Sequence, residues 1–317
     1  MGIKGLYFDG ELNYREDLIQ PVPAAGEALI RIRLSAICNT DLELMKGYNN
    51  YQGILGHEFV GKIEESNNPE LIGQRVVGDI NIGCGNCSFC LQGLNNHCPY
   101  RQVLGIQNKD GTFAEYITLP EVNLFPVPDA VSDQEAVLTE PLAAALEITN
   151  QVHIQPPQKV AVIGDGKLSF LITQVLALTG CDLIVIGKHQ ENLKRLKEFA
   201  EVEYFQEIKR NNQFDCIVEC AGNEAGLQLA EELIKPRGTI VLKSTYVGSP
   251  GFNPSGWVVN EVTLVGSRCG PMDSALRLLE KKLVKVYPII GRYYSLADYQ
   301  EAFSTKFPYK VSFDITE

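Results

Sequence analysis

The feature that most constrains this chain is a group of four closely spaced cysteines: Cys84, Cys87, Cys90 and Cys98. Four thiolates at these spacings can surround one tetrahedral zinc ion, and with all four positions filled by sulfur the zinc is expected to be structural. Gly83, Gly85 and Gly93 permit the tight turns that such a loop needs. Disulfides are the weaker interpretation, because cysteines with two residues between them bridge badly.

Composition narrows the class of protein. The 317 residues carry 28 Lys and Arg against 39 Asp and Glu, a net charge of -11, which disfavours nucleic acid and anionic membranes as partners. The acidic balance also argues against a nucleic-acid-binding zinc ribbon. The first residues hold no apolar signal core, and no apolar stretch approaches the roughly 18 residues that span a bilayer. We therefore expect a cytoplasmic protein, in which clustered cysteines indicate metal.

The pattern of secondary structure that the sequence predicts changes near residue 140. Before it, short alternating strands such as 28–37 are separated by Gly, Asn and Pro turns, with further strands expected at 57–65, 75–79 and 114–119. A helix is expected at 141–152, because Pro141 suits a first turn. Strands at 159–163, 183–186, 214–219, 239–243 and 262–265 then alternate with helices at 168–179, 191–200 and 224–234, followed by a helix at 296–303 and a strand at 309–314. This alternation predicts a parallel sheet with crossover helices.

A glycine motif follows the strand 159–163 and opens the next helix. It reads Gly-x-Gly-x-x-Ser from Gly164 to Ser169. Gly164 allows a tight turn, and Gly166 lets the backbone approach a pyrophosphate at the helix N-terminus. With the surrounding strands and helices, the motif predicts dinucleotide binding. The expected cofactor-binding residues are Gly164, Asp165, Gly166, Lys167, Leu168, Gly187, Lys188, His189, Ala221 and Ser244.

The residue at the end of the next strand normally determines whether NAD or NADP is bound. An acid there would hold the ribose 2′-hydroxyl of NAD. This chain has Gly187, which would leave room for a 2′-phosphate, followed by Lys188 and His189 as a cation and a second donor. We therefore expect NADP to be preferred, with NAD possible; the alternative is that Lys188 is an ordinary surface lysine.

Three dispersed residues offer the ligands of a second metal site. Cys38, His57 and Glu140 supply one thiolate, one imidazole and one carboxylate, which is the ligand mix of an open catalytic zinc site. Each residue alone has a plainer explanation. A lone cysteine is more often a buried small side chain, and a glutamate before proline is often only a helix start.

The order of the motifs resembles the medium-chain zinc alcohol dehydrogenases, in particular their polyol, threonine and glucose dehydrogenase branch. The motifs are Cys-x-Thr-Asp from Cys38, Gly-His-Glu from Gly56, the four-cysteine lobe, the segment 110–116 and Glu-Pro-Leu-Ala from Glu140. The resemblance covers essentially the whole chain. It implies a GroES-like β-barrel catalytic domain at residues 1–138 with a C-terminal tail at 285–317, and a Rossmann doubly wound domain at 139–284.

The resemblance also implies roles for individual residues. Cys38 and His57 would bind a catalytic zinc, with Glu58 or Glu140 as the third ligand, so that the chain would hold two zinc ions. Thr40 matches the hydroxyl that bonds the substrate oxygen. Many relatives carry a histidine that relays protons five residues after the zinc-binding cysteine, and this chain has Glu43 there.

The expected reaction is reversible hydride transfer between an alcohol and NAD(P). The strand at 262–266 resembles the edge strand that relatives pair across a dimer, so a homodimer or homotetramer is expected. Three alternatives stay open: a zinc-free quinone or enone reductase of the same fold, a non-catalytic NADP-binding sensor, and a structural zinc protein with a vestigial site. The substrate is expected to be a small alcohol or carbonyl compound.

Overall fold

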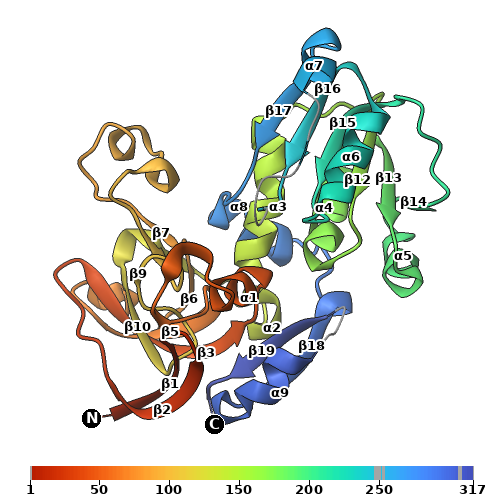
Figure 1. Ribbon diagram of the computed structural model, residues 1–317. Coiled ribbons are helices and arrows are strands. Elements are labelled where there is room, and N and C mark those ends of the chain that lie inside the picture. The colour runs from red at the N-terminus through yellow and green to blue at the C-terminus, as the bar shows by residue number, and fades with distance from the viewer. Residues whose placement is uncertain (1, 246–250, 252–253, 306–308, 317) are drawn as a thin grey trace. The chain divides into compact units, whose positions relative to one another are not determined.

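The chain divides into two compact units in the computed structural model shown in Figure 1. The structure describes residues 2–245, 251, 254–305 and 309–316. Unit 1 comprises Met1–Glu140 and Met272–Glu317, and unit 2 comprises Pro141–Pro271. Unit 1 is therefore discontinuous in sequence. Among the described residues, no helix combines the length and apolar character needed to cross a membrane.

Unit 1 is built on a seven-stranded sheet in the order β11-β6-β5-β3-β19-β18, with β10 also paired to β3. These strands are β3 (Glu27–Ala36), β5 (Glu58–Ser66), β6 (Arg75–Gly78), β10 (Tyr116–Pro120), β11 (Leu124–Pro126), β18 (Ile290–Tyr294) and β19 (Lys310–Asp314). The alternation expected around Ile30, Ile32 and Leu34 is confirmed, because all three side chains are buried. Strand β19 pairs antiparallel with β3, so the end of the chain completes the sheet that its beginning starts.

Unit 1 also contains two smaller sheets of three strands each. One has the order β2-β1-β4, with β1 at Gly2–Phe8, β2 at Leu12–Ile19 and β4 at Gly53–Ile54. The other has the order β7-β8-β9, with β7 at Asn81–Ile82, β8 at Gln102–Leu104 and β9 at Asn108–Lys109. The four-cysteine lobe is part of the segment that connects β7 to β8.

Short helices complete unit 1. They are α1 (Asn39–Met45), α2 (Asp133–Ala136), α8 (Met272–Glu280) and α9 (Tyr299–Ser304), and α3 (Thr139–Gln151) begins in this unit. Helix α8 contacts α2. Its residues therefore pack with unit 1, whereas the sequence placed residues 272–284 in the second domain.

Unit 2 holds six parallel strands in the order β14-β13-β12-β15-β16-β17. They are β12 (Lys159–Ile163), β13 (Asp182–Gly187), β14 (Glu201–Tyr204), β15 (Phe214–Glu219), β16 (Ile234–Leu242) and β17 (Thr263–Gly266). The helices between them are α4 (Lys167–Ala177), α5 (Gln190–Leu196), α6 (Glu224–Leu233) and α7 (Pro254–Val259). This strand order is that of the Rossmann fold, whose ligand crevice opens where the order reverses, here between β12 and β15.

The sequence predicts every strand of this parallel sheet except β14. The apolar runs of β12 and β15 are fully buried, which is why they read clearly. Strands β2 and β14 were missed, because most of their side chains are polar and exposed or half-exposed. The largely buried strand β1 and the short strands β4, β7, β8, β9, β11 and β18 were missed as well. Helix α8 was also missed. The helix expected at 296–303 is a 3-10 turn, Leu296–Asp298, that continues into α9.

Gly56 offers a test of this packing. Its φ is +93°, and a Cβ at this position would lie 2.6 Å from the Phe113 ring. We expect Gly56→Ala to lower the free energy of unfolding by roughly 2–4 kcal/mol, because left-handed strain and overpacking add. Gly26 has a φ of +80° with nothing within 4 Å of a Cβ, so Gly26→Ala is the matched control, with a loss of about 1 kcal/mol. Urea unfolding of both variants measures the difference, and equal losses would contradict it.

Candidate functional site

Cys38 is positioned by the start of α1. It is the N-cap residue, and its backbone N–H donates to Asp41 Oδ2 at 2.8 Å in a capping box. Its thiol Sγ lies 3.7 Å from Thr40 Oγ1. The Cys-x-Thr-Asp motif is thus one turn of helix that presents a thiol and a hydroxyl side by side.

His57 is held by a loop that pairs with the segment 110–113. Gly111, Phe113 and Thr112 donate their backbone N–H groups to the carbonyls of Ile54, Leu55 and Gly56 at 2.7, 2.9 and 3.0 Å. Gly111 is required for this approach, because a Cβ there would lie 2.3 Å from the Gly56 oxygen. The two motifs that the sequence analysis noted separately are therefore one structure.

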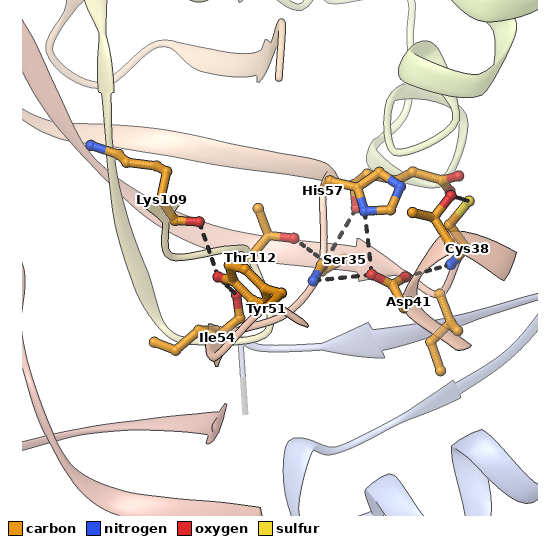
Figure 2. Close-up of polar contacts among 12 residues, drawn as sticks. Ser35, Cys38, Asp41, Tyr51, Ile54, His57, Lys109 and Thr112 are labelled. Atoms are coloured by element: carbon orange, nitrogen blue, oxygen red, sulfur yellow. Dashed lines mark hydrogen bonds and ion pairs between the residues drawn. The ribbon is translucent and has the colours of Figure 1, made fainter. Parts of the chain in front are cut away.

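Asp41 connects the two ligand-bearing segments. Its side chain is fully buried, and Oδ1 accepts the Gly56 N–H at 3.2 Å and lies 3.3 Å from His57 Nδ1 (Figure 2). Burial lowers the pKa of His57, but the negative charge of Asp41, followed by the Cys38 thiol, raises it well above its ordinary value. With Nδ1 facing a carboxylate, Nε2 is the nitrogen left to bind a metal.

Glu58 and Lys310 form a buried ion pair beside this group. Lys310 Nζ lies 2.5 Å from both Glu58 oxygens, and the two side chains are 5% and 0% exposed. Burial lowers the pKa of Lys310, but the charges of Glu58 and then Cys38 raise it overall. Glu58 begins β5 and Lys310 begins β19, so two neighbours of the central strand β3 deliver the pair.

Within the described residues, the ligand atoms of Cys38, His57 and Glu58 all lie within 4.8 Å of one another. Glu140 is not in that group. Burial raises the pKa of Glu140 to about 7, with the charges of His57 and Glu58 acting in opposite directions, so it shares their surroundings. Glu43 forms an ion pair with Lys46 at 2.8 Å and is mostly covered.

The four-cysteine lobe brings its thiols together as expected. The ligand atoms of Cys84, Cys87, Cys90 and Cys98 lie within 4.8 Å of one another, and all nine cysteines, each among the described residues, are free thiols. Backbone hydrogen bonding at Asn86 lowers the pKa of Cys84 to about 7, whereas burial raises that of Cys90 to about 11. Donor type and separation fit one zinc ion, and disulfides are absent.

Unit 2 contains a pocket of about 250 Å³ at the carboxyl ends of its central strands. Its lining includes Gly164, Asp165, Gly166, Gly187, Lys188, His189 and Ala221 from the expected set. Lys167, Leu168 and Ser244 are not in the lining. Gly166 is the N-cap of α4 without a side-chain cap, and a Cβ on it would meet nothing within 4 Å, so the helix end is open to a phosphate.

One premise of the cofactor argument is wrong. Gly187 was expected to leave room for a 2′-phosphate, but a Cβ at this position would lie 2.6 Å from both Cβ and Oδ2 of Asp165. The Asp165 side chain already fills that space.

Several site residues were missed by sequence reasoning. Asp41 carries a signal, since an acid three residues after an N-cap predicts a capping box. Lys310 carries none, because 252 positions separate it from Glu58. The pocket also gains Phe205, Cys220 and Asn223, and only tertiary structure brings Phe205 there.

Comparison with known proteins agrees with this geometry. Residues 24–129 match the model of the alcohol dehydrogenase GroES-like domain. A sorbitol dehydrogenase of Halalkalibacterium halodurans is 28% identical over 307 residues, covering 90% of this chain and 89% of that protein.

Solved structures extend the likeness to the whole chain. An Escherichia coli alcohol dehydrogenase solved with NADH has a TM-score of 0.89 and 28% identity, covering 98% of this chain and 99% of the other. A putative zinc-binding dehydrogenase of Sinorhizobium meliloti, bound to NADP, has a TM-score of 0.90 and 25% identity, with 99% of each chain covered. The two neighbours bind different cofactors, so the likeness alone leaves the choice between NAD and NADP open.

The buried ion pair makes a stability prediction. Lys310→Met leaves the Glu58 carboxylate buried without its partner, so we expect the free energy of unfolding to fall by about 3–5 kcal/mol. Lys310→Met combined with Glu58→Gln should regain most of that loss, because both charges are then gone. Urea unfolding at constant zinc content measures both variants. A double variant no more stable than the single one would contradict the argument.

Proposed function

This chain belongs to the zinc-type medium-chain alcohol dehydrogenase family, and on that premise we propose that it transfers a hydride reversibly between NAD(P) and a primary or secondary alcohol group of a polyol, a sugar or a similar alcohol. It is an alcohol oxidoreductase that uses NAD(P). The observation that carries the proposal is the approach of Cys38, His57 and Glu58 to within 4.8 Å in one buried corner of unit 1. The similarity to a sorbitol dehydrogenase supports the substrate class.

The residues that would hold a catalytic zinc are Cys38 and His57, with Glu58 or Glu140 as the third ligand. Both oxygens of Glu58 accept from Lys310, and Glu140 lies outside the close group, so neither is singled out. A zinc ion at such a site acts as a Lewis acid on the substrate oxygen. Asp41 orients His57 through Nδ1 and fixes Cys38 through its backbone, so one carboxylate positions two ligands.

Thr40 is the proposed carrier of the substrate's hydroxyl proton. Its Oγ1 lies 3.7 Å from Cys38 Sγ, so a substrate oxygen near that thiol is within reach of this hydroxyl. A threonine hydroxyl relays a proton rather than acting as a base. Glu43 lies in α1, four residues before the turn at Gly47. We propose that its carboxylate influences the transfer of the proton onward from Thr40.

The four-cysteine lobe is proposed to bind a second, structural zinc. Its four thiols leave no open coordination position. The chain would then hold two zinc ions, and the lobe would bind the tighter one.

The pocket of unit 2 is proposed to bind the nicotinamide cofactor, which supplies the hydride acceptor. The sequence predicted a preference for NADP over NAD from Gly187, Lys188 and His189, but that prediction has lost its steric premise, because Asp165 fills the space beside Gly187. A cytoplasmic location and assembly into a homodimer or homotetramer stay predictions. Strand β17 does lie at the edge of its sheet, as pairing across a dimer requires.

Turnover and zinc content test the function together. Purified protein should form NAD(P)H with at least one alcohol in a panel of polyols, sugars and hydroxy amino acids, and should contain two zinc ions per chain. Cys38→Ser should stay folded, keep the lobe zinc and lose turnover. Cys87→Ser should lose the lobe zinc and melt at lower temperature, because structural zinc contributes roughly 10–16 kcal/mol in small peptides.

Two outcomes would contradict the proposal. Absence of turnover with every alcohol, in protein with full zinc content, would favour the non-catalytic sensor. If the parent protein contains one zinc ion per chain and Cys38→Ser contains the same amount, the chain is better explained as a structural zinc protein with a vestigial site.

The role of Glu43 has its own test. Glu43→Ala should change the pH dependence of kcat, because the onward proton path loses its carboxylate, and should leave cofactor affinity nearly unchanged. Lys46→Ala is the matched control, since it removes the partner of the ion pair and keeps the carboxylate. If the profile of Glu43→Ala overlays that of the parent, Glu43 has no part in the proton path.

A further inference from the structure

The carboxylate of Asp165 occupies an unusual place for a residue of a glycine loop. It lies between the two glycines of the loop, yet its side chain reaches across to the end of β13. Oδ2 accepts the backbone N–H groups of Lys188 and His189 at 2.8 and 2.6 Å, and His189 Nδ1 lies 2.9 Å from Oδ1. The Asp165 side chain is only 9% exposed and lines the pocket.

The carboxylate of Asp165 fills the space that an acidic side chain at the end of β13 would otherwise occupy. A Cβ on Gly187 would lie within 2.6 Å of Asp165 Cβ and Oδ2, so the two side chains compete for one volume. In Rossmann folds, an acid at the end of the second strand accepts a hydrogen bond from the ribose 2′-hydroxyl of NAD. The chain lacks that acid at position 187 but places a carboxylate in the same space from position 165.

Accordingly, resting on the proposed nucleotide-binding role of this pocket, we infer that Asp165 selects NAD over NADP by accepting the 2′-hydroxyl of the adenosine ribose. The carboxylate can accept about four hydrogen bonds. The two backbone amides and His189 use three of these positions, and His189 Nδ1 must be the donor because a carboxylate only accepts. One acceptor position on Oδ1 is left for a hydroxyl.

A 2′-phosphate meets two obstacles at the same place. The N–H groups of Lys188 and His189, which could have bound an anion, already donate to Asp165. The carboxylate itself repels the phosphate, and its burial weakens the screening of that repulsion by solvent.

Lys188 does not reverse this balance. Its ammonium lies 4.4 Å from the centre of the Phe205 ring, in a cation–π contact, and the residue is exposed. An exposed cation is more strongly screened than a carboxylate in the pocket wall. The less solvated charge, that of Asp165, therefore decides the preference.

Equilibrium titration of the zinc-loaded full chain with NADH and with NADPH, followed by nucleotide fluorescence, tests the inference. The parent should bind NADH about ten- to hundredfold more tightly, the range expected for one hydrogen bond to a charged group. Asp165→Asn keeps the size of the side chain and removes its charge, so the ratio of the two dissociation constants should shift toward NADPH by a similar factor. Glu191→Gln is the matched control, because it removes an exposed carboxylate outside the pocket lining and should leave the ratio within about twofold.

Moving the acid gives a second, independent test. Gly187→Asp alone should bind both dinucleotides poorly, because it collides with Asp165. Asp165→Gly combined with Gly187→Asp should recover NADH preference, whereas Asp165→Gly alone should not.

The outcomes separate this inference from the proposed function. If the parent binds neither dinucleotide, the proposed function fails and the inference fails with it. If the parent binds both equally, or NADPH more tightly, nucleotide binding stands and the role of Asp165 is overturned. An unchanged ratio in a folded Asp165→Asn variant overturns it as well. Should that variant not fold, the ratio in the parent still decides.

Discussion

One buried carboxylate organises the candidate catalytic centre. Asp41 is a capping residue, a loop anchor and a histidine partner at once, because its two oxygens reach Cys38, Gly56 and His57. A fully buried charge is costly unless it is hydrogen-bonded, so these contacts stabilise one another. The thiol and the imidazole come from separate segments, and Asp41 is what makes them neighbours in a fixed geometry.

The contrast between the two candidate metal-binding groups explains how far the sequence could be interpreted. The four cysteines of the lobe lie close together in the chain, so their spacing alone predicted the cluster that the structure contains. The other group depends on pairing between β3, β5 and β19. Cys38 and His57 were singled out by their ligand chemistry and by the resemblance, but the buried lysine that faces Glu58 lies 252 positions away in the sequence and has no local signal.

In the fold, too, the features that have a local sequence signal were predicted and those without one were missed. Strands buried on both faces, such as β12 and β15, have continuous apolar runs and were predicted almost to the residue. Strand β2, with most of its side chains exposed, was missed because exposure removes the pattern. At the cofactor pocket, Gly187 was interpreted as empty space, since nothing in the sequence shows that the side chain of Asp165, 22 positions earlier in the numbering, fills it. Local motifs reveal backbone geometry; they do not reveal which neighbour occupies the volume that a glycine leaves.

The place of β19 has a consequence for synthesis on the ribosome. The strand lies between β3 and β18, and Lys310, its first residue, supplies the countercharge of Glu58. The nascent chain must therefore expose the whole of unit 2 before the sheet of unit 1 can close. Domains generally fold in the order in which they emerge, but here the first unit has to wait for the second. The cysteine lobe brings its four thiols together from contiguous residues and so does not have to wait, while Glu58 stays without its partner until β19 has been synthesised.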